Sequence, residues 1–119
     1  MLTELGKYLR SLRGESGELL KEMADKLAIS PSMLSSIEGG TRNVPKGFVE
    51  KLTVSYHLAS KEQESLRLAI AQTREEVAVS LHGLSQEDQK LAFSFARRFS
   101  DLDDESKMSI RRILNEEED

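Results

Sequence analysis

Residues 30–45, SPSMLSSIEGGTRNVP, contain the start and the end signals of one short helix. Ser30 is a favoured N-cap residue, because its hydroxyl can accept from a free backbone N–H of the first turn. Pro31 then falls at the first helical position, where its missing N–H costs nothing. Gly39-Gly40 supplies the permissive backbone of a C-cap, and Pro45 prevents the residue before it from continuing a helix.

The faces of this predicted helix differ in character. Leu34 and Ile37 lie three residues apart and share one side. The remaining faces carry short or flexible side chains, namely Ser32, Met33, Ser35 and Ser36. Such a helix is either a core helix with a serine-rich exposed side, or a helix that lies close against another surface such as DNA. The neighbouring segments decide between these alternatives.

The flanking segments predict further short helices around one leucine-rich core. Apolar residues recur there at three- and four-residue steps, which is typical of amphipathic helices. They are Leu2, Leu5, Leu9 and Leu12, then Leu20, Met23, Ala24 and Leu27, and, over about residues 46–57, Phe48, Val49, Leu52 and Tyr56. About three residues separate the second and third helices, which is a helix-turn-helix arrangement. We therefore expect a domain of four or five helices over residues 1–58.

The motifs MADKLAIS at 23–30 and LSSIEGG at 34–40, between Gly17 and Pro45, resemble those of the XRE family. These are the lambda-repressor and Cro-like helix-turn-helix regulators. The resemblance covers about half of the chain. It implies a lambda-repressor-like DNA-binding domain whose third helix enters the major groove.

The resemblance also implies roles for individual residues. Base-reading positions of the family are occupied here by Pro31, Ser32, Met33 and Ser36, and backbone-contacting positions by Ser35, Gly39, Thr41, Arg42 and Asn43. Serine and methionine select bases weakly, so we expect more reliance on DNA shape and on phosphate contacts. The candidates for phosphate contact are Arg42, Lys46, Lys21 and Arg10.

Two further positions follow from the same resemblance. Arg13 and Glu38 match a pair that bridges the first and third helices in several relatives. The Ser/Thr-Gln that opens the second helix in the family is replaced by Leu19-Leu20, which removes a capping residue and a phosphate ligand. We expect Ser16 to cap this helix instead, from an earlier start.

The second half, residues 59–119, predicts a helical extension. Ser60 as N-cap and Gln63 reaching back would form a capping box for a helix that ends near Arg74. Alternation of apolar residues predicts a short strand over residues 75–81. Such a strand would pair with a second subunit across a two-fold axis, or else the segment is an extended linker.

A C-terminal helical hairpin should follow from an N-cap at Ser85. It is either packed on the first domain or part of a dimerisation module over residues 75–114. Several large apolar side chains fall outside a single stripe, which favours burial from two sides. The candidate dimerisation residues are Val77, Val79, Leu81, Phe93, Phe95, Phe99 and Ile113.

Composition limits the function classes. Residues 1–58 hold 8 Lys and Arg against 7 Asp and Glu, and residues 59–119 hold 9 against 14, so the acid is concentrated in the second half. DNA binding requires a local basic face and not a basic total. The chain has no Cys and no apolar run long enough to span a membrane, which suits the cytoplasm. We find no pattern for catalysis, metal binding or a cofactor.

The sequence thus predicts a mainly all-α, sequence-specific DNA-binding transcriptional regulator. We expect a dimeric repressor of bacterial or phage origin that occludes promoter DNA. One alternative is an antitoxin-type regulator whose second half binds a protein partner such as a toxin. Another is a protein-interaction module with little affinity for DNA.

Overall fold

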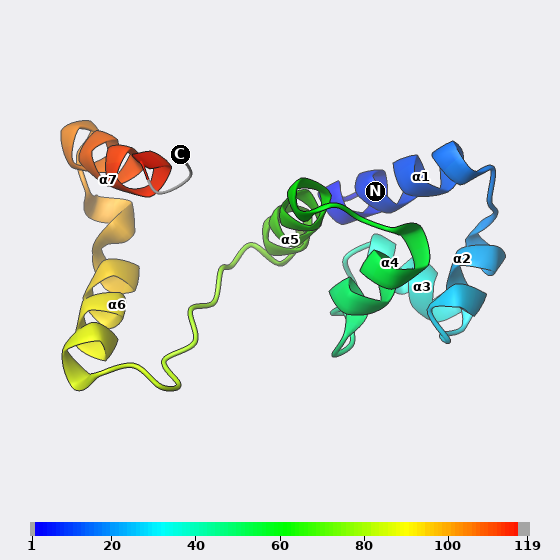
Figure 1. Cartoon of the computed structure of the whole chain (residues 1–119), viewed down its shortest axis with the longest axis horizontal. Coiled ribbons are helices and arrows are strands. Elements are labelled where there is room, and N and C mark those ends of the chain that lie inside the picture. Colours follow the sequence, from blue (N-terminus) through cyan, green and yellow to red (C-terminus); the bar gives the residue numbers. More distant parts are fainter. Residues whose placement is uncertain (1, 117–119) are drawn as a thin grey trace. The chain divides into compact units, whose positions relative to one another are not determined.

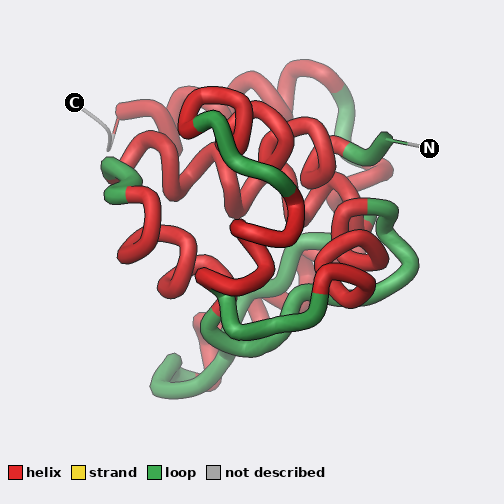
Figure 2. Tube along the Cα trace, turned by 90° about the vertical axis from the view of Figure 1, so that its right-hand side faces the viewer, coloured by secondary structure: helices red, strands yellow, loops and turns green. Residues whose placement is uncertain are grey.

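The computed structural model describes residues 2–116, and Figure 1 shows them as helices joined by loops. The elements are α1 (Glu4–Ser16), α2 (Leu20–Lys26), α3 (Pro31–Glu38), α4 (Phe48–Tyr56), α5 (Ser60–Arg74), α6 (Gln86–Arg98), the 3-10 helix η1 (Phe99–Asp101) and α7 (Asp104–Glu116). Figure 2 shows helix and loop but no strand over these residues. The predicted all-α class is confirmed.

The chain divides into two compact units, Met1–Val77 and Ala78–Asp119. The first unit holds α1 to α5, with α3 against α1 and α2, and α5 against α1 and α4. The expected domain boundary after residue 58 therefore falls inside this unit. The packing of α5 on α1 joins that helix to the helix-turn-helix region.

A closed hydrophobic core lies at the centre of the first unit. All five helices contribute to it, together with two leucines from the loops that follow α2 and α4: Leu5, Leu9, Leu12, Met23, Ala24, Leu27, Leu34, Ile37, Phe48, Leu52, Leu58 and Leu66. The predicted apolar stripes are thus confirmed except at one end. Leu2 is 39% exposed, because Thr3 is the N-cap and α1 begins only at Glu4.

The predicted ends of α3 are confirmed. The Ser30 hydroxyl accepts from the backbone N–H of Met33 at 3.0 Å, and Pro31 is the first helical residue. After the C-cap Gly39, Gly40 has φ +81°, a left-handed conformation that favours glycine. The helix therefore stops where the sequence indicates.

The predicted cap of α2 by Ser16 is wrong. Ser16 is the last residue of α1, and its hydroxyl donates to the Leu12 carbonyl at 3.3 Å. The N-cap of α2 is Leu19, whose backbone N–H donates to the Glu22 carboxylate at 3.0 Å. A glutamate three residues into a helix can satisfy the N-cap amide without any hydroxyl at the cap itself.

The cap of α5 is shifted by one residue for the same reason. Ala59, not Ser60, is the N-cap, and its N–H donates to the Glu62 carboxylate at 2.9 Å. Gln63 does not close the predicted box, because its side-chain amide donates to the Leu58 carbonyl. The predicted extent of this helix, up to Arg74, is confirmed.

Two threonines join the start of α1 to the ends of α3 and α5. The Thr3 hydroxyl donates to the Glu38 carbonyl at 2.5 Å, while the Thr73 hydroxyl accepts from the Leu5 N–H at 3.0 Å. Gly6 lies at the same junction, where an added Cβ would come within 2.8 Å of the Glu38 carbonyl oxygen. The approach of α1 to α3 therefore requires glycine at position 6.

The predicted strand over residues 75–81 is not formed within the single chain. Residues 76–81 are coil, with Val77 81% and Val79 65% exposed. An extended strand needs a partner for its backbone hydrogen bonds, and no described residue provides one. Pairing across two subunits stays a prediction.

The second unit has regular helix ends. The Ser85 hydroxyl accepts from the Asp88 N–H at 3.1 Å, as the sequence predicts, and the Asp103 carboxylate accepts from the Ser106 N–H at 2.8 Å. No residue of α6 is buried. α7 meets the end of this segment, where Lys107 Nζ lies 5.3 Å from the centroid of the Phe99 ring, while Leu91 and Phe93 of α6 stay exposed.

We predict opposite effects of alanine at two glycines of α1. Gly14→Ala should raise the free energy of unfolding by about 1 kcal/mol, since alanine is the better helix former and nothing lies within 4 Å of the added Cβ. Gly6→Ala should be less stable than Gly14→Ala by about 1–3 kcal/mol, because the added methyl group overpacks the contact with Glu38. Urea unfolding of both variants measures this, and equal stability would contradict the close approach.

Candidate nucleic-acid interface

The outer face of α3 is polar and uncharged. Pro31, Ser32 and Ser35 are exposed, whereas Ser36 is half-buried. Met33 was predicted to face outward with the serines, but it is half-buried and packs against the core. Its side chain therefore offers a base only part of its surface. The single ionisable residue of this helix, Glu38, is buried and points inward.

Arg13 and Glu38 form the bridge that the sequence resemblance implies. Both residues are only 7% exposed. The two guanidinium nitrogens of Arg13 donate to the two carboxylate oxygens of Glu38, one of them at 3.1 Å. Such a paired, planar contact fixes direction as well as distance. It therefore holds the last turn of α1 against the last turn of α3.

The residues that follow α3 are tied back to it. The Ser36 carbonyl accepts from the backbone N–H of Thr41 at 3.0 Å and from that of Arg42 at 3.3 Å. The Thr41 hydroxyl donates to the same carbonyl at 3.2 Å. Arg42 and Asn43 are exposed directly beyond this turn. The residues predicted to contact the DNA backbone therefore lie at the carboxyl end of α3.

A second arginine comes to the same end from α1. Arg10 lies four residues after Gly6 and three before Arg13, and both of these neighbours contact Glu38. Residues at such spacing share one helix face. Arg10 is exposed, so its guanidinium group is available on the edge of α1 that adjoins the end of α3.

The start of α4 adds a feature that the sequence analysis missed. Its N-cap is Gly47, with φ +81° and no side-chain hydrogen bond to the first turn. Free backbone N–H groups at a helix N-terminus favour an anion. The exposed Lys46 directly precedes this cap, but the Phe48 N–H already donates to the Pro45 carbonyl at 3.1 Å and the first turn holds Glu50. The Lys-Gly pair was the available signal in the sequence.

The start of α2, in contrast, is already occupied by an anion. The Glu22 carboxylate accepts from the Leu19 N–H, and Leu19 itself is 71% exposed. A phosphate at this place would meet a negative charge. Lys21 and Lys26 are the exposed cations of α2, and Lys26 is paired with a carboxylate.

The other lysine of α2 has an internal role. Lys26 lies 2.5 Å from the Glu18 carboxylate and 4.7 Å from the centroid of the Tyr56 ring. Its hydrogen bond lowers the pKa of Glu18, and burial together with that carboxylate raises the pKa of Tyr56. Lys26 thus joins α2 to α4 and is a poor candidate for binding phosphate.

Two other kinds of site are absent from residues 2–116. No three His, Asp or Glu side chains gather there as metal ligands would. None of the helices described is both long and apolar enough to cross a membrane.

Comparison with known proteins gives one match. Residues 4–66, more than half of the chain, match a family model described as a helix-turn-helix domain. No curated protein and no solved structure matches the chain. The matched range extends into α5, in agreement with the packing of that helix in the first unit.

We predict that Arg13→Ala lowers the free energy of unfolding by about 3–5 kcal/mol, because it leaves the Glu38 carboxylate buried without a partner. The double variant Arg13→Met/Glu38→Leu should lose much less, since an apolar pair replaces both charges. Urea unfolding of the three proteins measures these losses. If Arg13→Ala were as stable as the unsubstituted protein, the bridge would not hold α3.

Proposed function

The chain belongs to the helix-turn-helix domain family, and on this premise we propose that it is a sequence-specific DNA-binding transcriptional regulator of the XRE type. The observation that carries the proposal is the way in which α3 is attached to α1. A buried ion pair with two hydrogen bonds holds α3 on α1, while the outer face of α3 is uncharged and rich in serine. A helix in this position can enter the major groove without repelling the DNA backbone.

The proposed manner of recognition follows from the side chains. Ser32, Ser35 and Ser36 can donate to or accept from base edges, but none of them makes the paired hydrogen bonds that select one base strongly. Affinity would come from phosphate contacts by Arg42, Lys46, Arg10 and Lys21. Specificity would come in larger part from the shape and deformability of the DNA.

We further propose that the protein acts as a dimeric repressor of bacterial or phage origin. Helix-turn-helix proteins commonly read two half-sites about one helical turn of DNA apart, which requires a two-fold arrangement. The second unit supports this proposal, because its apolar side chains lack a core of their own. Repression would be steric, through occlusion of promoter DNA, and the proposal requires neither catalysis nor a cofactor.

The alternative is a regulator whose second unit binds another protein, as an antitoxin binds its toxin. The exposed apolar side chains of α6 and α7 support this alternative as well. A pure interaction module would show no DNA retention at any salt concentration. A DNA-binding regulator would show retention that falls steeply as salt rises.

We predict that Arg42→Ala weakens binding to all DNA sequences about equally, by about 1 kcal/mol, and reduces the salt slope by about one unit. Arg67→Ala serves as a matched control, because Arg67 is an exposed arginine of α5 paired with Glu64. Titration of both variants at several salt concentrations measures the effect. Unchanged affinity and slope would remove Arg42 from the interface.

We also predict that residues 1–77 fold alone, because the core side chains lie within this unit. The truncated protein should be monomeric and should bind an operator more weakly than the full chain. Sedimentation velocity and DNA titration measure both properties. A truncated protein that still sediments as a dimer would place the dimer interface in the first unit.

A further inference from the structure

Helix α6 presents an apolar face that stays partly exposed along its length, with Lys107 of α7 lying over the Phe99 ring at its end. Leu91 is 69% exposed, Phe95 44% and Phe99, which begins η1, 46%. These residues are spaced by four, so they form one stripe. The Phe95 and Phe99 rings lie 5.3 Å apart, centroid to centroid. Leu84 lies in the loop before the helix and Leu102 is extended after η1, so the helical stripe itself runs from Leu91 to Phe99.

The charges beside this stripe are divided along the helix. α6 begins with Glu87 and Asp88 and ends with Arg97 and Arg98. Glu87 and Arg98 are separated by about three helical turns of 3.6 residues each, so they lie on the same side of the helix. Both adjoin the apolar stripe at Leu91. One flank of the stripe is therefore acidic at its start and basic at its end.

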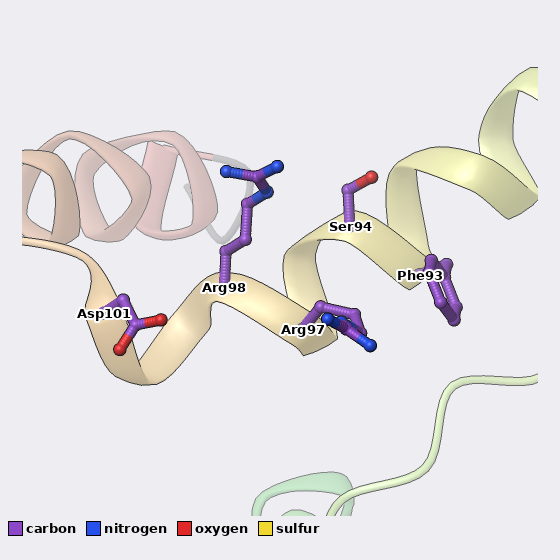
Figure 3. A pocket seen from close by; sticks show the side chains of 5 residues that line it. All are labelled: Phe93, Ser94, Arg97, Arg98 and Asp101. Atoms are coloured by element: carbon purple, nitrogen blue, oxygen red, sulfur yellow. The ribbon is translucent and has the colours of Figure 1, made fainter.

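The two arginines in the last turn of α6 point in different directions. Figure 3 shows Arg98 and Ser94 pointing to one side of α6, and Arg97 and Phe93 to another, around a shallow hollow. The Arg97 guanidinium lies 5.9 Å from the centroid of the Phe93 ring. Arg97 is therefore engaged away from the flank that carries Glu87. Substitution of one arginine can therefore serve as a control for substitution of the other.

We propose that α6 pairs antiparallel with α6 of a second copy of this chain, with Glu87 facing Arg98 of the partner subunit. The inference rests on the dimeric regulator proposed above and specifies its interface. A two-fold axis near residues 92 and 93 makes this contact twice. It also sets Leu91 near Phe95 of the partner subunit. The surface is thus complementary to itself, as a two-fold interface requires.

The charges favour this arrangement over a parallel one. A parallel pair would place Glu87 beside its own copy and Arg98 beside its own copy, and like charges at such positions are repulsive. They also favour a second copy over an unrelated partner. α6 holds two acidic and three basic residues, so its net charge does not select a partner of one sign.

The test uses the full chain and four variants with substitutions at these positions. Arg98→Glu and Glu87→Arg should each raise the dissociation constant of the dimer about tenfold, because each replaces two attractive contacts by two repulsive ones. An equimolar mixture of the two variants should restore dimers, since both contacts are then attractive again. Analytical ultracentrifugation, without DNA, measures all of these states.

Two controls define the interface further. Arg97→Glu changes charge equally but lies off the flank, so its dimer should dissociate as the unsubstituted dimer does. The double variant Glu87→Arg/Arg98→Glu should self-associate without mixing, because each contact is reversed in place. Circular dichroism of every variant should match that of the unsubstituted protein.

Several outcomes would overturn the inference. One is an unsubstituted chain that stays monomeric at about 100 times the concentration at which it binds operator DNA. A second is a pair of single variants whose dimers dissociate no more readily than the unsubstituted dimer. The others are a mixture of the two single variants that forms no dimers, and an Arg97→Glu dimer that is weakened as much as the Arg98→Glu dimer. None of these outcomes bears on DNA binding by the first unit. The salt-dependent retention and the Arg42→Ala titration test that separately.

Discussion

The buried ion pair between Arg13 and Glu38 is the constraint on which the DNA-binding unit depends. It joins the last turn of α1 to the last residue of α3 with two hydrogen bonds. The Thr3 hydroxyl and the missing side chain of Gly6 bring the same two helices together at the other end of the contact. A short helix has little stability of its own, so its direction comes from such tertiary contacts. The contacts on the buried side of α3 therefore determine which of its faces is exposed.

The two units treat their apolar side chains in different ways. The first unit buries most of its leucines in a closed core, so its fold is complete within one chain. The second unit leaves leucines, phenylalanines and isoleucine on the surface of α6 and α7. Apolar surface of this kind marks interaction sites in proteins. The helix-turn-helix region and the exposed apolar surface therefore lie in different parts of one small chain.

The candidate site was partly accessible from the sequence. The serines of α3, the Arg13–Glu38 pair and Arg42 could be found because local motifs and a family resemblance fix their positions. The half-burial of Met33 and the N-cap of α4 could not be found in this way. The first depends on how α3 rests on the core, and the second on Gly47 adopting a positive φ before the helix. The first is set by contacts between helices, and the second by the conformation of one loop residue.

By itself the sequence determined the all-α class, the apolar stripes of the first four helices except at Leu2, and both ends of α3. Each follows from residues within about one or two helical turns. Only the tertiary structure decided that α5 belongs to the DNA-binding unit, because the Thr73 hydroxyl meets the Leu5 N–H across 68 residues of chain. It also decided which residues cap α2 and α5, where glutamates replaced the expected serines. Patterns report local geometry, whereas partners distant in sequence are known only once the chain has folded.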